Sequence, residues 1–164
     1  MLKQIYTSPF GDILLIVDKG FLVYCNWMEE ECNAKLHSLE KNLGASLHTC
    51  DQIVMNETIS QLKEYFSGKR KEFNIPTDAS ASPFRKKVWE AISGIRHGEM
   101  ATYKELANKI GSPSAYRAVA QACGANPIAI IIPCHRVIGS GASLGGYTGG
   151  IEKKIALLSL ENQG

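Results

Sequence analysis

The sequence predicts an α+β protein in which a small antiparallel sheet with helices is followed by a mainly helical half. Three observations predict this architecture. Short apolar runs separated by turn residues occupy the first 27 residues, which is typical of antiparallel strands. Apolar residues at helical spacing dominate after Ser82. Small and polar residues lie between the halves, so we expect a supporting domain at 1–77, a linker at 78–81 and a second domain at 82–164.

The overall composition is that of an ordinary globular protein. Of the 164 residues, 45% are hydrophobic and 21% are charged, which excludes wholesale disorder. No apolar run approaches the roughly 20 residues that span a bilayer, so we expect no membrane association. The first residues also lack the basic-then-apolar pattern of a secretory signal. We therefore expect a cytoplasmic protein, or a nuclear one in a cell that has a nucleus.

Charge is divided unequally between the two halves. Residues 1–81 hold 8 Lys and Arg against 11 Asp and Glu, a balance of −3. Residues 82–164 hold 10 against 5, a balance of +5. A cationic excess suits an anionic partner such as a nucleic-acid backbone, although many domains carry one by chance. The charge supports such a partner without identifying it.

The five cysteines indicate reduced thiols. Their number is odd, and they follow no disulfide framework. The first half holds a few Cys and His residues that could be imagined as metal ligands, but their spacing matches no compact zinc pattern. These residues are Cys25, Cys32, His37, His48 and Cys50. We therefore predict no metal site.

The first half is predicted to contain strands followed by helices, because its apolar runs change from short segments to spacings of three and four. The predicted elements are strands at 2–7, 12–18 and 21–27, a helix at 32–43, a short strand at 47–50 and a helix at 59–66. Nothing in this half forms a catalytic constellation.

The second half is predicted to contain a helix-turn-helix. Its predicted helices cover 84–95, 102–110, 112–124 and 151–161. Ser82 is a suitable N-cap for the first, and Thr102 with Glu105 fits a capping box that opens the second. Gly111 then separates two short helices, as in a helix-turn-helix. Small residues in the 112–124 helix would let a partner's surface approach closely, but they would equally allow tight packing within the domain.

A reactive group follows a predicted buried strand in this half. The β-branched run Ile130–Ile132 predicts the strand, which Pro133 ends. Cys134, His135 and Arg136 come directly after the break, where a scaffold can present a nucleophile. A buried structural thiol beside a surface histidine is the alternative. The pair alone favours this alternative, because free cysteine usually packs as a small hydrophobe.

The last predicted helix carries an apolar face with a carboxylate at its edge. Ile151, Ile155 and Leu158 are predicted to face the core. Glu161 lies three residues beyond Leu158, and a glutamate near a chain terminus is usually solvated. The helix alone therefore assigns no role to Glu161.

Several short motifs of the second half occur in a characteristic order. They are Thr102-Tyr103-x-Glu105-Leu106-Ala107, Arg117-Ala118-Val119, Asn126-Pro127, Ile132-Pro133-Cys134-His135-Arg136-Val137, Gly146-Tyr147-x-Gly149-Gly150 and Leu157-Leu158-x-Leu160-Glu161. Together they resemble the O6-alkylguanine-DNA alkyltransferase family over about Ser82 to Glu161. The first half matches only in size and element order. The resemblance implies a ribonuclease-H-like first domain and a winged-helix-like second domain.

The resemblance implies DNA repair by direct alkyl transfer. The alkyl group of O6-alkylguanine, and of O4-alkylthymine as a second substrate, would move irreversibly to Cys134. Each molecule would act once, as a methylated-DNA–protein-cysteine methyltransferase. The partner would be double-stranded DNA with the damaged base flipped out of the helix. No cofactor and no metal are implied, and we expect a monomer.

The resemblance also implies a role for each matching residue near the thiol. A free thiol has a pKa of about 8.5 and needs a base at neutral pH. His135 would take the proton of Cys134 through a bridging water, and Glu161 would support the imidazole. Asn126 would brace the hinge before the nucleophile. Tyr103 would protonate the leaving guanine.

Other matching residues would bind the DNA. Arg117 would fill the stack vacated by the flipped base, while its helix lies in the minor groove. Further DNA contacts would come from Tyr116, Ala118, Ala120 and Arg136. The pocket for the base would be formed by Val137, Tyr147 and Thr148.

Two positions depart from the commoner pattern of the family. Arg96-His97 stands where a proline and an aromatic residue are frequent, which predicts a changed loop with its chemistry retained. Tyr116 is bulkier than the residue in many relatives, which predicts an altered DNA contact.

Three other functions remain open on the residues alone. An alkyltransferase-like protein that binds the lesion without repair would lack the acceptor, so Cys134 argues against it. A Cys-His hydrolase normally brings its two residues from distant positions, unlike adjacent Cys134 and His135. A DNA-binding regulator without chemistry would leave Cys134, His135 and Glu161 unexplained.

Overall fold

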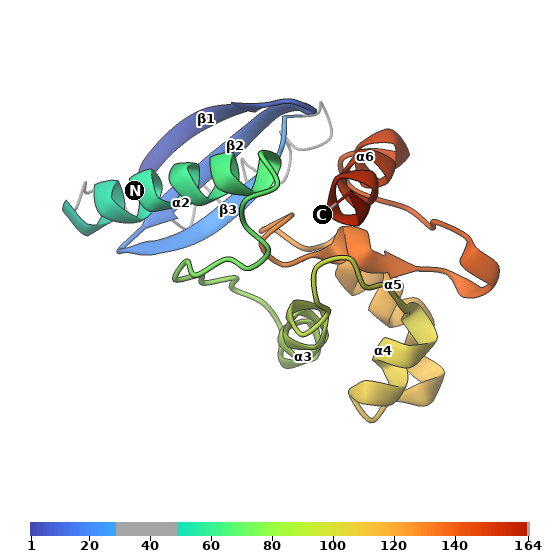
Figure 1. Cartoon of the computed structure of the whole chain (residues 1–164). Helices are drawn as coiled ribbons and strands as arrows, with labels where there is room; N and C mark the ends of the chain where they lie inside the picture. The colour runs from blue at the N-terminus through green and yellow to red at the C-terminus, as the bar shows by residue number, and fades with distance from the viewer. Residues whose placement is uncertain (29–48, 164) are drawn as a thin grey trace. The chain divides into compact units, whose positions relative to one another are not determined.

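The structure, a computed structural model, describes residues 1–28 and 49–163 (Figure 1). The chain divides into two compact units, Met1–Asp78 and Ala79–Gly164. Within the described ranges, no helix combines the length and the apolar character needed to cross a membrane.

The first unit is built on an antiparallel three-stranded sheet in the order β1-β2-β3. Its strands are β1 (Leu2–Ser8), β2 (Gly11–Asp18) and β3 (Phe21–Trp27). The three predicted strands are confirmed. Leu2 pairs with Val17 and Ser8 with Gly11, so the short turn between β1 and β2 sets the register of the pair.

Helix α2 (Thr49–Phe66) packs against all three strands. It begins well before the helix predicted at 59–66, and the strand predicted at 47–50 is wrong in its second half, which is helical. The first half of that strand and the helix predicted at 32–43 lie outside the described residues. The apolar spacing did not predict the first turns of α2, because the residue buried in the first turn, Asp51, is polar. The Asp51 carboxylate accepts a hydrogen bond from a backbone N–H of the β2–β3 turn (2.7 Å).

The second unit is mainly helical, as predicted (Figure 1). Its elements are α3 (Pro83–Ser93), β4 (Ala101–Thr102), α4 (Tyr103–Lys109), the 3-10 turn η1 (Pro113–Ala115), α5 (Tyr116–Gly124), η2 (Cys134–Arg136), β5 (Val137–Ile138), η3 (Ser140–Ala142) and α6 (Ile151–Asn162). Helices α4 and α5 pack together as the predicted helix-turn-helix. Strands β4 and β5 pair in parallel, which links the start of α4 to the end of η2.

The start of α4 is fixed by the predicted capping box. The Glu105 N–H donates to Thr102 Oγ1 (3.2 Å), and the Thr102 N–H donates to the Glu105 carboxylate (2.6 Å). These two bonds satisfy backbone donors at the helix start and hold Tyr103 in the first turn. Ser82 occupies the N-cap of α3, but its side chain makes no capping hydrogen bond.

The strand predicted at 130–132 is wrong. These residues form a tight turn in which the Ile132 N–H donates to the Ile128 carbonyl (2.9 Å). Ile130 has a φ of 72°, a left-handed conformation that β-branched residues rarely adopt. Such a conformation costs on the order of 1–3 kcal/mol. Burial of Ile128 and Ile130 in the core stabilises the turn despite the local preference for a strand.

The predicted buried face of α6 is also wrong. Ile151 and Ile155 are 41% and 46% exposed, whereas Lys154, Leu157 and Glu161 are buried. Apolar spacing misassigned the face because two of the three buried residues are charged. Hydrogen bonds inside the unit satisfy both charges, as described below.

Candidate active site

Cys134 is buried at the start of η2, directly after the turn (5% exposed). The Asn126 side chain holds this segment. Its Nδ2 donates to the Ile132 carbonyl (2.8 Å) and to Cys134 Sγ (3.2 Å). Its Oδ1 accepts from the Ile128 N–H (3.0 Å). One amide therefore closes the turn and directs a donor at the sulfur, which favours the thiolate over the thiol.

His135 and Glu161 form a buried pair. His135 Nε2 lies 2.7 Å from Glu161 Oε1, and both side chains are fully buried. Arg136 donates from Nε and Nη2 to the same carboxylate (2.9 Å each) and from Nη1 to the Ile95 carbonyl (2.6 Å). Burial alone raises the pKa of Glu161. The hydrogen bonds from His135 and Arg136 outweigh burial and hold this pKa well below its ordinary value.

An ionised Glu161 fixes the tautomer of His135. A carboxylate only accepts hydrogen bonds, so Nε2 carries the hydrogen and Nδ1 is the basic nitrogen of the neutral ring. Nδ1 is buried and makes no hydrogen bond to the described residues. Burial lowers the pKa of His135, although Glu161 opposes this. The ring is therefore neutral at neutral pH and able to accept a proton.

Lys154 is a residue of the site that the sequence reasoning missed. Its side chain is fully buried, and Nζ donates to the Val137 carbonyl (2.5 Å) and to the Leu144 carbonyl. It thereby ties the segment after η2 to the helix that carries Glu161. Burial lowers the pKa of Lys154, whereas a thiolate at Cys134 raises it. The available signal was the spacing of seven residues from Lys154 to Glu161, which places both on one helix face.

Tyr103 opens α4 and is half-buried. Its hydroxyl lies against Gly145, where an added Cβ would come within 2.7 Å of the oxygen. Gly145 has a φ of +64°, so both the space and the backbone favour glycine. Burial raises the pKa of Tyr103, and thiolates at Cys123 and Cys134 raise it further. The hydroxyl therefore keeps its proton at neutral pH and can donate it.

The residues predicted to line the base pocket lie on two segments. Val137 is fully buried in β5. Thr148 Oγ1 donates to the Gly124 carbonyl at the end of α5 (3.0 Å), and the Gly150 N–H donates to the Tyr147 carbonyl (3.0 Å). The glycine-rich segment before α6 is therefore attached to the helix-turn-helix.

The outward face of α5 holds four of the predicted DNA contacts. Tyr116, Arg117 and Ala118 are exposed, and Ala120 is half-buried. The Arg117 guanidinium lies over the Tyr116 ring, 5.7 Å from its centroid. Residues 106–151 contain no Asp or Glu. This stretch therefore offers no carboxylate to repel a phosphate backbone.

Arg136 does not belong to that face. Its side chain is 6% exposed, and its guanidinium donates hydrogen bonds to the Glu161 carboxylate and the Ile95 carbonyl. The predicted DNA contact of Arg136 is therefore wrong, because a phosphate could reach it only by breaking a buried ion pair. Arg136 instead holds the carboxylate that contacts His135.

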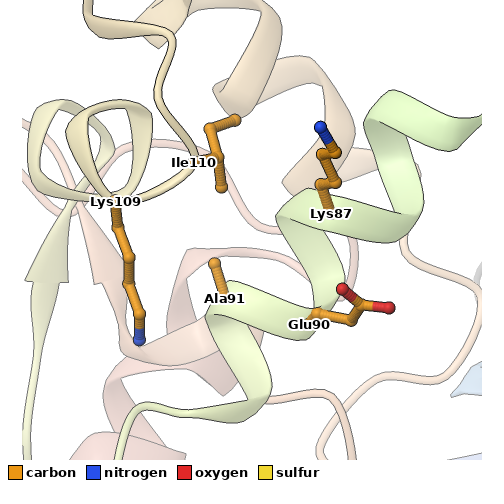
Figure 2. A pocket seen from close by; sticks show the side chains of 5 residues that line it. All are labelled: Lys87, Glu90, Ala91, Lys109 and Ile110. Carbon is orange, nitrogen blue, oxygen red and sulfur yellow. The ribbon is translucent and has the colours of Figure 1, made fainter.

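An open cavity of about 420 Å³ lies between α3 and α4 (Figure 2). It is lined by Lys87, Glu90, Ala91, Lys109 and Ile110. None of these lining residues is among the predicted site residues. In the part of the chain that the structure describes, no cluster of His, Cys, Asp or Glu is suited to a metal ion.

The fold and the site together define a class of protein: a nucleic-acid-binding protein that carries a cysteine nucleophile. A helix-turn-helix shares one compact unit with a buried cysteine, and the histidine beside that cysteine is backed by an ionised carboxylate. Such a unit combines a surface for nucleic acid with a nucleophile that has its own base.

Comparison with known proteins places the chain within this class. Residues 1–79 match the domain described as "6-O-methylguanine DNA methyltransferase, ribonuclease-like domain", and residues 83–163 match "6-O-methylguanine DNA methyltransferase, DNA binding domain". The chain therefore belongs to the 6-O-methylguanine DNA methyltransferase family. The resemblance seen in the motifs and the predicted fold class are both confirmed.

Individual relatives agree with this assignment. The methylated-DNA–protein-cysteine methyltransferase of Methanosarcina acetivorans is 40% identical over 98% of this chain and 98% of its own length. That of Mycobacterium tuberculosis is 48% identical over 69% of this chain and 68% of its own. The M. tuberculosis O6-methylguanine methyltransferase structure matches with a TM-score of 0.82 and 36% identity, covering 98% of this chain and 92% of that one. M. tuberculosis OGT in complex with DNA matches with a TM-score of 0.81, 35% identity and the same coverage.

Proposed function

We propose that this protein repairs DNA by transferring the alkyl group of O6-alkylguanine directly and irreversibly to Cys134. The relatives described above bear the name of this activity, and one related structure contains DNA. The observation that carries the proposal is the arrangement at the thiol. Asn126 donates to its sulfur, and the adjacent His135 is backed by the ionised Glu161. O4-alkylthymine is proposed as a second substrate.

Transfer begins with deprotonation of Cys134. A free thiol has a pKa of about 8.5 and is mostly protonated at neutral pH. His135 Nδ1 takes the proton through one bridging water, and the Glu161 carboxylate stabilises the imidazolium that forms. The Asn126 donor and the positive charge of Lys154 stabilise the thiolate.

Displacement then occurs at the alkyl carbon. The Cys134 sulfur forms a bond to that carbon as the bond from carbon to guanine O6 breaks, and the released electron pair moves to the guanine. Tyr103 gives its proton to the leaving guanine and is reprotonated from solvent, while His135 releases the thiol proton to solvent. Thiol and alkylguanine thus become thioether and guanine without a co-reactant, so no cofactor is proposed.

The damaged base reaches a buried thiol only by leaving the duplex. Helix α5 is proposed to lie in the minor groove, where small side chains such as Ala118 and Ala120 permit close approach. Arg117 fills the space that the base leaves in the stack. The pocket that receives the base is formed by Val137, Tyr147 and Thr148.

The two domains are proposed to have different roles. Residues 82–164 are proposed to bind DNA and accept the alkyl group, residues 1–77 to support them, and 78–81 to link the two. One chain carries every proposed site residue, so the protein is proposed to act as a monomer. We also propose a cytoplasmic location, or a nuclear one where a nucleus exists, because a reactive free thiol requires a reducing compartment.

Repair is expected to stop after one event per molecule, because the thioether has no route back to a thiol. With O6-methylguanine duplex in excess, the lesions repaired should equal the molecules of active protein, measured as labelled methyl bound to protein. The Cys134→Ser control should bind the duplex and transfer nothing. Repair that continues beyond one lesion per molecule would refute the proposal.

The transfer rate is expected to persist as pH falls through the ordinary histidine range. Burial lowers the pKa of His135 below its usual value of about 6.5, so Nδ1 remains a free base there. Below the lowered pKa the rate should fall. Stability should decline earlier, as pH falls from about 6.5 toward the lowered pKa, because the unfolded chain binds the proton first in that range. Single-turnover rates against pH test this, with circular dichroism as the folding control; a rate already halved at about pH 6.5 would contradict it.

A further inference from the structure

Tyr116 is a large aromatic side chain with a solvent-exposed part. It opens α5 and is 37% exposed. The residues of α5 that face the core are Val119, Ala122 and Cys123. An aromatic residue with this exposure, at the start of a helix in a helix-turn-helix, is available to a partner.

The ring of Tyr116 is held beside Arg117. The Arg117 guanidinium carbon lies 5.7 Å from the ring centroid, within the range of a cation–π contact. Consecutive helical residues do not normally face each other. The contact therefore requires Arg117 to extend back across the ring, so the two side chains share one exposed surface.

The position of the ring is set by the backbone before it. The turn η1 (Pro113–Ala115) runs directly into α5, and the Ala115 N–H donates to the Ser112 carbonyl (2.9 Å). Pro113 restricts its own φ, which further limits the freedom of this turn. The backbone at Tyr116 is thus restrained before a partner binds, which lowers the backbone entropy lost on binding.

We propose that Tyr116 is a second DNA-inserting residue that acts together with Arg117. This inference rests on the proposed function. Arg117 enters the gap left by the flipped base, and the Tyr116 ring stacks on the exposed face of a neighbouring base. Stacking of a base on an aromatic side chain contributes about 1–3 kcal/mol, and wedges of this kind stabilise a distorted minor groove. The pair therefore lengthens the lifetime of the flipped state.

The competing role for Tyr116 is to restrain Arg117 in the free protein. In that case the cation–π contact would have to break before insertion, and Tyr116 would slow repair. The two roles predict opposite signs for removal of the ring. Neither role affects transfer from a free alkylguanine base, which needs no flipping, so the free base is the control substrate for both.

The test compares Tyr116→Ala, Tyr116→Phe and Arg117→Ala in single-turnover transfer from an O6-methylguanine duplex and from the free base O6-benzylguanine. Tyr116→Ala should lower the duplex rate about tenfold, the equivalent of about 1.4 kcal/mol, and leave the free-base rate unchanged. Tyr116→Phe should retain the wild-type rate, because stacking needs the ring and not the hydroxyl. Ile151→Ala, which removes an exposed apolar side chain on α6, is the matched control and should leave both rates unchanged.

Base flipping is measured separately by placing 2-aminopurine at the target position and recording its fluorescence with saturating protein that carries Cys134→Ser. The double variant with Cys134→Ser and Tyr116→Ala should give a smaller fluorescence increase than Cys134→Ser alone. A duplex rate that is unchanged or raised by Tyr116→Ala, an equal loss on free base, or a Tyr116→Phe rate as low as that of Tyr116→Ala would overturn the inference. Failure of the wild type to transfer alkyl from either substrate would instead overturn the proposed function.

Discussion

Replacing Glu161 by alanine is expected to remove both stability and activity. The carboxylate is buried and accepts hydrogen bonds from His135, from two nitrogens of Arg136 and from the Gly98 N–H (3.3 Å). Its loss leaves the Arg136 charge buried without a counter-charge, which typically costs about 3–5 kcal/mol of the free energy of unfolding. Urea unfolding of the variant against wild type measures this loss.

A second substitution at this position separates the charge of Glu161 from its shape. Glu161→Gln keeps an oxygen that accepts from His135 Nε2 but cannot stabilise an imidazolium by charge. We expect its single-turnover rate to fall about 100-fold, the lower end of the effect of general-base catalysis. Glu152, exposed on the same helix, provides the control Glu152→Gln, which should change neither stability nor rate. Wild-type repair by Glu161→Gln would contradict the proposed support of His135.

Asn126→Asp is expected to have the second largest effect, because it replaces a donor by an acceptor at the thiol. The new side chain still accepts from the Ile128 N–H, but it loses the donor to Cys134 Sγ and to the Ile132 carbonyl. Hydrogen bonds to charged groups contribute about 1.5–3 kcal/mol. Since each 1.36 kcal/mol is tenfold in rate, transfer should slow by about 10- to 100-fold.

The pKa of Cys134 tests whether Asn126 acts by donating a hydrogen bond to the sulfur. An oxygen anion beside the sulfur disfavours a second negative charge, so the pKa of Cys134 should rise in Asn126→Asp. The pH dependence of Cys134 alkylation by iodoacetamide measures that pKa. Asn126→Ala, which removes the donor without adding charge, should shift it less. A slow Asn126→Asp variant with an unchanged thiol pKa would show that Asn126 acts only by holding the turn.

Elements with local signals were predictable from the sequence. The strands of the first unit follow from short apolar runs between turn residues, and β1 and β2 pair as expected. The start of α4 follows from Thr102 and Glu105, whose capping bonds involve only neighbouring residues. The identities of Cys134 and His135 are also local, because they are adjacent.

Elements decided by distant contacts were not predictable. Ile130 has a strong local preference for a strand, yet Asn126 and core packing stabilise a left-handed turn there. Lys154 received no prediction from the sequence, because only the fold supplies the carbonyls that satisfy its buried charge. The resemblance implied a DNA contact for Arg136, whereas its partner is Glu161, which lies 25 residues further along the chain. In the cases of Lys154 and Arg136, a charged group is buried because partners elsewhere in the sequence compensate its loss of water.

The chemical fate of Cys134 is the central claim, and peptide mapping by mass spectrometry tests it most directly. After incubation with a duplex containing O6-methylguanine and no added cofactor, we predict one added methyl group on the peptide that contains Cys134. The peptides that contain the other described free cysteines, Cys25, Cys50 and Cys123, should remain unmodified. A methyl group on any of those residues, or loss of methyl from the DNA without modification of Cys134, would contradict the account.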